Sequence, residues 1–211
     1  MTSRPLLPGI AALVLLCTTV LSHAQTTAPL VGPAIGIAAQ SLSNKAAYTS
    51  SVASINGQSS STSDTDISLV GSWGFDLTDQ WVTLVGLSYG LSETDMSRIN
   101  YTSGGAQSFT AKTKDHLALY VAPGYRFHPL AVLYARLAHH QLKVEYSDTA
   151  TDTSSRTFTG SGVGAGLAYT LGRNLELRVE YETVRYQSER IHLTDAKLEQ
   201  NILSGALLYK F

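Results

Sequence analysis

The chain has 211 residues, a formal net charge of −1 and only 15% charged residues. This length suits a single domain. A balance this close to neutral argues against the basic surface that nucleic-acid binding requires, and a single cysteine, Cys17, excludes a disulfide framework.

Residues 1–24 have the pattern of a cleaved secretory signal. A basic start at Arg4 precedes an apolar stretch from Ile10 to Leu16, and Ala24 closes a small-residue cleavage site. The apolar stretch is too short to span about 30 Å of hydrocarbon. We therefore expect a mature domain of residues 25–211, without Cys17.

Alternating apolar and polar residues then recur along the chain, and no helical period competes with them. Each alternating segment is long enough for a tilted bilayer crossing of about 9–11 residues. Eight strands are predicted, at residues 33–42, 63–75, 80–92, 114–127, 130–146, 157–170, 174–187 and 197–211.

The gaps between these strands alternate in length. Gaps 76–79, 128–129 and 171–173 are short, and the others are longer and rich in Ser, Thr, Asp and Gly. Short turns at one end and long loops at the other are typical of transmembrane β-barrels. The predicted loops are 43–62, 93–113, 147–156 and 188–196, with Tyr48 and Tyr101 as isolated aromatics in the first two.

Odd-numbered positions carry the apolar residues within the strands, so they are predicted to face lipid. Aromatic residues on this face gather near the short turns and form a predicted girdle of Trp73, Phe75, Trp81, Tyr125, Phe127 and Tyr169. A second, less complete girdle at the other rim would include Tyr89, Tyr181 and Tyr146.

Even-numbered positions carry charges, which we expect inside the barrel. In a narrow lumen opposite charges should pair and leave little continuous water. The alternative is a solvated face of a soluble sheet. The predicted lumen network comprises Arg126, Arg136, Glu176, Arg178, Glu180, Glu182 and Lys210.

Glycine occupies every inward position from Gly160 to Gly166. The missing side chains leave space for residues such as Tyr120, Tyr134, Arg136 or Arg178. A phosphate-binding loop is the alternative interpretation, but no helix follows this run.

The last strand alternates up to Tyr209 and Phe211. Together with the segments Val163 to Tyr169 and Leu175 to Tyr181, it resembles the small eight-stranded outer-membrane barrels of the OmpA-like and opacity-protein-like group. The resemblance covers the mature chain. It implies an all-β, antiparallel up-and-down barrel with periplasmic termini, Tyr209 and Phe211 as the signal for the barrel assembly machinery, and contact with lipid and lipopolysaccharide. Pro123 departs from the pattern and predicts a bulge.

Histidines raise the alternative of a lipid A-modifying enzyme. His139 and His140 are adjacent in a strand and so face opposite ways, which prevents joint binding of one metal or one serine. We expect His140 in the lumen, His139 near the lipid headgroups, and His116 and His192 near loops. A lipocalin-like soluble barrel would need the opposite facing of every strand.

The sequence therefore predicts a non-catalytic outer-membrane scaffold without cofactor or metal. It would display four loops, with residues 43–62 and 93–113 as the candidate contacts for a host or surface ligand and no nucleic-acid partner. A narrow, poorly conducting pore is the alternative, and the lipid A enzyme ranks last.

Overall fold

A computed structural model describes residues 30–50, 56–102, 106–148, 151–191 and 194–211. The predicted signal segment, residues 1–24, lies outside this part of the chain. The described residues contain no helix that is long and apolar enough to cross a membrane.

The strands form a closed antiparallel ring. Each strand pairs with the next around the ring, and the last strand returns to the first through a continuous register from Ala34–Lys210 to Ser50–Thr194. The eight strands of the ring are β1 (Gly32–Ser50), β2 (Ser59–Asp76), β3 (Trp81–Gly90), β5 (Ala106–His128), β6 (Ala131–Asp148), β7 (Thr151–Thr170), β8 (Leu175–Tyr186) and β10 (Thr194–Lys210). The predicted eight-stranded barrel is confirmed.

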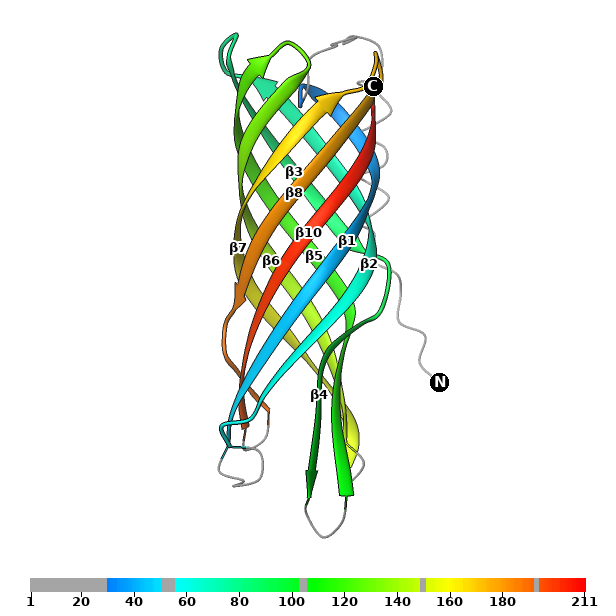
Figure 1. Cartoon of the computed structure of the whole chain (residues 1–211), viewed down its shortest axis with the longest axis vertical. Helices are drawn as coiled ribbons and strands as arrows, with labels where there is room; N and C mark the ends of the chain where they lie inside the picture. Colours follow the sequence, from blue (N-terminus) through cyan, green and yellow to red (C-terminus); the bar gives the residue numbers. More distant parts are fainter. Residues whose placement is uncertain (1–29, 51–55, 103–105, 149–150, 192–193) are drawn as a thin grey trace, which may run out of the picture.

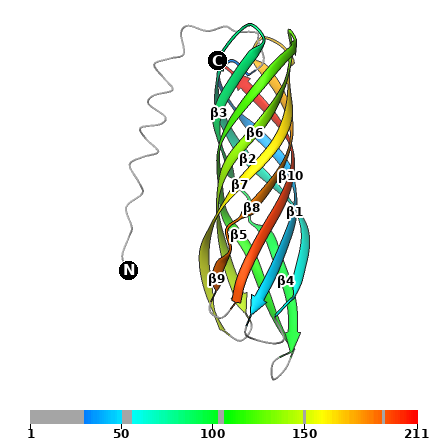
Figure 2. The same cartoon turned by 90° about the vertical axis from the view of Figure 1, so that its left-hand side faces the viewer.

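Two further strands lie at one end of the barrel. β4 (Thr94–Thr102) follows β3 along the chain and pairs with β5, and β9 (Glu189–Ile191) pairs with β10. Figure 1 shows the short turns and the C-terminus at the opposite end from β4, and Figure 2 shows β9 at the same end as β4. We call these ends the short-turn end and the loop end.

Six of the eight ring strands are longer than predicted and continue into the four predicted loops, whereas β3 and β8 stay within their predicted bounds. β1 and β2 together cover most of residues 43–62, and β4 and β5 form a hairpin within residues 93–113. Figure 2 shows the same extension of the sheet at the loop end. The predicted loop bounds are therefore too wide, because parts of all four segments are strand.

The predicted facing of the strands is confirmed. Odd-numbered apolar residues are exposed on the outer face, as with Ile37 at 59% and Leu133 at 56%, and their even-numbered neighbours are buried. A cluster of Leu30, Val82, Leu84, Tyr120, Ala122, Val132, Tyr134, Ala138 and Ala168 fills part of the lumen toward the short-turn end.

The bulge predicted at Pro123 is absent. Val121 pairs with Leu137 and Gly124 with Tyr134, so β5 keeps one register across the proline. The register of β5 against β6 shifts instead between Thr113 and Asp115 and between Arg126 and His128.

Candidate functional site

Strand β8 lines the lumen with three carboxylates and one guanidinium. Arg178 Nε donates to Glu176 Oε1 over 2.7 Å, and the two side chains are 2% and 0% exposed. The other carboxylate oxygen of Glu176 accepts the Leu30 N–H at 2.7 Å and lies 4.0 Å from Lys210 Nζ. Arg178 also donates to the Ser72 hydroxyl. These groups compensate the charge of a carboxylate that is fully removed from solvent.

A second ion-pair group lies farther toward the loop end. Arg136 contacts Glu180 at 2.8 Å and Glu182 at 3.0 Å, so a single guanidinium bridges two carboxylates. Its Cζ lies 3.7 Å from the ring centroid of Tyr120. The Tyr134 hydroxyl donates to Glu180 at 2.6 Å.

A histidine pair extends this group. His140 Nε2 lies 2.9 Å from Glu182 Oε1, and His140 Nδ1 lies 2.9 Å from His116 Nε2. A neutral His140 that donates to the carboxylate has an accepting Nδ1, so His116 then donates to it. His139 is exposed on the outer face, opposite to His140. His116 pairs with Gly90 at the end of β3, close to the predicted loop 93–113, and its ring is buried in the lumen. The even-numbered position of His116 in its strand was the sequence signal that its side chain faces the lumen.

The structure brings together six residues of the predicted network and leaves one apart. Arg126 lies at the short-turn end, where it contacts Asp76 Oδ1 at 2.6 Å and donates to the Asp79 carbonyl. The other six residues form the two lumen ion-pair groups: Glu176, Arg178 and Lys210 in one, and Arg136, Glu180 and Glu182 in the other. Sequence reasoning did not identify His116 or Ser72 as their partners.

The glycines of β7 make room for these side chains. A Cβ at Gly162 would lie 2.8 Å from His140 Nε2 and would overlap the Glu182 carboxylate. A Cβ at Gly166 would lie 2.5 Å from the Tyr134 ring. The space left by the missing side chains is therefore occupied by the polar network.

Above the histidine pair, apolar side chains are buried together inside the barrel. Phe158 and Leu142 come from predicted strands and Met96 from a predicted loop, and all three are 0% exposed. We call this group the loop-end core: Leu42, Ala46, Tyr48, Met96, Ala111, Leu142, Val144, Tyr146, Phe158, Val184, Tyr186, Ala196, Leu198 and Ile202.

In the loop-end core, apolar residues face the lumen instead of the outside of the barrel. On β1, Ile35 and Ile37 face outward, whereas Leu42, Ala46 and Tyr48 face inward. This change of parity within one strand was the signal that β1 continues beyond residue 42.

Two tyrosines were misassigned for the same reason. Tyr48 was predicted in a loop and Tyr146 in the outer girdle, but both are buried in the loop-end core. Burial raises the pKa of the Tyr48 hydroxyl. The side chain of Tyr101 lies outside the described residues.

The outer surface near the start of β4 carries a charged pair. Lys114 Nζ lies 2.7 Å from Glu93 Oε1 and 3.8 Å from Glu145 Oε1. Its hydrogen bond to Glu93 lowers the pKa of that carboxyl.

Aromatic side chains surround the short-turn end on the outer face. Trp81 packs edge-on against Tyr125, with ring centroids 5.3 Å apart, and Tyr209 packs against Phe211 at 5.1 Å. The Phe211 N–H donates to the Pro33 carbonyl at 3.1 Å. All members of the predicted girdle are exposed there: Trp73, Phe75, Trp81, Tyr125, Phe127 and Tyr169.

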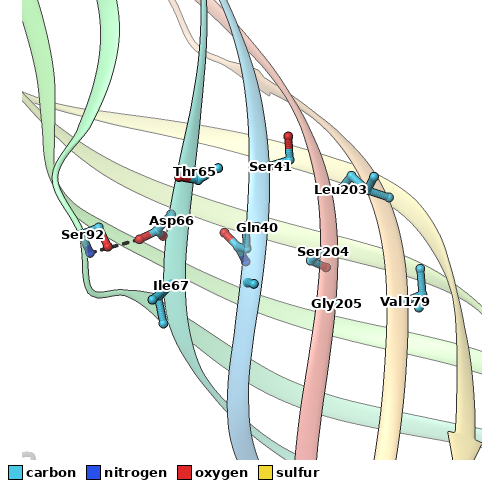
Figure 3. Close-up of a pocket in the computed structure, with 11 residues that line it drawn as sticks. Gln40, Ser41, Thr65, Asp66, Ile67, Ser92, Val179, Leu203, Ser204 and Gly205 are labelled. Atoms are coloured by element: carbon cyan, nitrogen blue, oxygen red, sulfur yellow. Dashed lines mark hydrogen bonds between the residues drawn. The ribbon is translucent and has the colours of Figure 1, made fainter.

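The outer face also has a hollow of about 570 Å³ over β1 and β10. Its lining includes Ala39 and Gly205, which are paired across the two strands. Ile67 and Val179 flank this pair, and Figure 3 shows them on either side of Gly205. Because Gly205 has no side chain and nothing lies near its ideal Cβ position, the surface is recessed there.

Solved structures of small bacterial outer-membrane proteins resemble this chain at low identity. The attachment invasion locus protein Ail of Yersinia pestis, in complex with the heparin analogue sucrose octasulfate, has a TM-score of 0.46 and 15% identity over 84% of this chain and 99% of its own. Neisserial surface protein A has a TM-score of 0.47 and 15% identity, covering 84% and 99%. The Escherichia coli outer membrane protease OmpT has a TM-score of 0.48 and 10% identity, covering 85% and 96%.

No curated protein matches the chain. A family model described as the outer membrane protein beta-barrel domain matches residues 9–211. The closed ring of strands, the apolar outer face and this match lead to one conclusion: the chain belongs to the outer membrane protein beta-barrel domain family.

Proposed function

We propose that this protein is a non-conducting, non-catalytic outer-membrane scaffold that presents a rigid β-structured loop end to a surface partner. The observation that carries the proposal is the loop-end core. Its side chains are buried together in the lumen above the ion pairs, which supports a barrel without a continuous aqueous path.

The histidine pair supports a structural role over a catalytic one. His116 and His140 are 8% and 1% exposed, and their hydrogen bonds go to each other and to Glu182. A catalytic group must reach the substrate within hydrogen-bond distance. Imidazoles enclosed in this way have no access to a lipid on the outer face.

The orientation is part of the proposal, with the loop end outside the cell and both termini in the periplasm. Cysteine labelling on whole cells tests it. Ser188→Cys at the loop end should react with a membrane-impermeant maleimide, and Gly172→Cys at the short-turn end should react only after lysis. The reverse pattern would overturn the orientation.

Conductance in planar bilayers tests the scaffold. The folded barrel should produce only rare, small events, because the loop-end core blocks the lumen. The variant Phe158→Ala, which removes the largest fully buried side chain among the described residues, is the matched attempt to open a path. Large, steady currents through the unchanged protein would establish a pore instead.

Mass spectrometry of lipid A tests catalysis. Overexpression of the protein should leave lipid A acylation unchanged. Loss of an acyl chain that disappears with His140→Ala would show that the barrel is an enzyme.

A further inference from the structure

The barrel wall is incomplete along the loop half of β2. The β2–β3 ladder ends at Ser68 and Gly90, and one further bond joins the Leu91 N–H to the Ile67 carbonyl at 2.8 Å. Beyond that point, residues 59–66 pair only with β1 among the described strands. β2 therefore has a free edge toward the loop end.

β4 does not close this gap, because inward side chains of β2 bind its backbone. Asp64 Oδ2 accepts the Asp95 N–H at 2.8 Å, and the Thr62 hydroxyl donates to the Asp95 and Met96 carbonyls at 3.0 Å. The Ser60 hydroxyl bonds the Arg98 backbone at 3.3 Å. Figure 1 shows β4 running beside the first part of β5. β4 is thus held against the inner face of β2, where the Met96 side chain joins the loop-end core.

The free edge presents backbone groups at odd-numbered residues. The Ile67 carbonyl points to the β3 side, and residues two apart in a strand point their N–H and C=O groups the same way. The Thr65 N–H is bonded to Asp64 Oδ1 at 2.8 Å. The unpaired N–H groups at this edge therefore belong to Ser59, Ser61 and Ser63. The carbonyls of these three residues and of Thr65 point to the same edge as acceptors.

The outward face of this edge lacks the usual protection against strand addition. Natural edge strands carry outward lysines, prolines or bulges that block pairing. The outward side chains here are Ser59, Ser61, Ser63 and Thr65, all small, neutral and exposed, and the β1–β2 register has no bulge.

We propose that the β2 edge, residues 59–65, binds an extended polypeptide segment of another protein, which adds to the barrel wall as an antiparallel strand. The proposal rests on the scaffold function and names the chemistry of its partner. Alternating donors and acceptors at strand spacing match a polypeptide backbone, whereas a lipid chain offers no donors. Because the edge has no charged outward side chain, recognition depends on the backbone of the partner.

A second copy of this chain fits the edge less well. Two copies in one membrane have the same orientation, so they would be related by a two-fold axis along the membrane normal. Their β2 strands would then run in the same direction across the membrane. Because the strands are tilted, they would also cross each other at twice the tilt angle. Flush antiparallel pairing of β2 with β2 would need oppositely directed barrels. A separate extended segment has no such restriction.

The test uses the folded barrel in lipid nanodiscs and a fluorescent probe, the blocked heptapeptide Thr-Val-Thr-Val-Thr-Val-Thr. Saturable binding is expected. The same peptide, N-methylated at its three central residues so that both pairing edges are blocked, should not bind. Equal binding of the two peptides would overturn the proposal.

Substitutions on the edge provide the matched comparison. Ser61→Pro and Ser63→Pro each remove an N–H that faces the gap, while bonds to β1 come from even-numbered residues. Each should weaken binding at least about fivefold, as expected for a lost backbone hydrogen bond. Ser61→Ala and Ser63→Ala keep the backbone and should bind like the parent. Unchanged binding by folded proline variants would place the peptide elsewhere.

Amide exchange of the unsubstituted barrel keeps the test independent of proline folding. The amides of Ser61 and Ser63 should exchange rapidly alone and slowly with the peptide. Protection without any peptide, or oligomers joined through β2, would overturn the proposal. Conductance of the same preparation separates the scaffold proposal from the edge proposal. A barrel that conducts and binds the peptide would refute only the scaffold function. A barrel that does not conduct and does not bind the peptide would refute only the edge site.

Discussion

His116 and His140 are 24 residues apart in the chain, yet Nε2 of the first lies 2.9 Å from Nδ1 of the second inside the lumen. His140 also binds Glu182, so it connects two groups that have little access to water. Its immediate neighbour His139 is exposed on the outer face. The two adjacent histidines therefore provide an internal comparison.

His140→Leu should lower the free energy of unfolding by about 1–3 kcal/mol, because it leaves the His116 ring and a Glu182 oxygen without their hydrogen bonds. His139→Leu should have little effect. Urea titration of both variants in bilayers measures the difference. Equal midpoints for the two variants would contradict the observed hydrogen-bond chain.

Arg178→Met should destabilise the barrel by about 3–5 kcal/mol, because Glu176 would lose the guanidinium at 2.7 Å while remaining buried. The double variant Arg178→Met with Glu176→Gln should recover much of this loss. Arg185→Met, on the exposed side of the same strand, is the control. A double variant no more stable than Arg178→Met would show that packing, rather than charge, dominates at this position.

Gly164→Ala should cost about 1–3 kcal/mol, because the added methyl group meets backbone of the neighbouring strand. The contacts are the Tyr181 carbonyl and, at 3.0 Å, the Glu182 Cα. Gly205→Ala adds the same methyl group to open space on the outer face and should be tolerated. Thermal unfolding of both variants in the same detergent compares them directly, and similar losses would be inconsistent with the close strand contact.

Val179→Arg tests whether the outer face meets lipid. Val179 is 49% exposed and lies between Gly205 and Leu167 in the strand register. Arginine near the middle of the bilayer should cost about 2–4 kcal/mol. Ser188→Arg at the loop end should be nearly silent. If both variants unfold at the parent urea concentration, the outer face does not contact hydrocarbon.

Deletion of Phe211 should reduce the fraction of folded, membrane-inserted protein, because it removes the terminal aromatic that packs against Tyr209 and the N–H that binds Pro33. Heat-modifiable gel migration measures the folded fraction. Phe127→Ala removes another exposed aromatic of the girdle and serves as control. Equal loss in both proteins would assign the effect to the girdle and not to a terminal assembly signal.

Period-two alternation was sufficient to predict the ring of strands and the facing of residues such as Ile37 and Arg136. Within the apolar band, one face contacts a uniform solvent, so hydropathy reports side-chain direction reliably. Arg126 has the correct parity but lies at the end of its strand, where Asp76 is nearer than the lumen network. An odd or even position in a strand therefore predicts which way a side chain points, but it does not predict which residues the side chain contacts.

The strand extensions were missed because their outer residues are Ser, Thr and Lys, a composition shared with loops. Only the inward positions, such as Ala46 and Tyr48, kept an apolar pattern, and it had changed parity. The route of β4 could not be inferred from sequence, since it depends on Thr62 and Asp64 of another strand.

The loop-end core links surface display to completion of the barrel. Leu42 belongs to the first strand and Leu198 to the last, and both contribute to this cluster. The core therefore cannot assemble until the final strand has joined the first. A barrel arrested partway through insertion would present no ordered outer platform, so a ligand that recognises this platform would distinguish finished molecules from stalled ones.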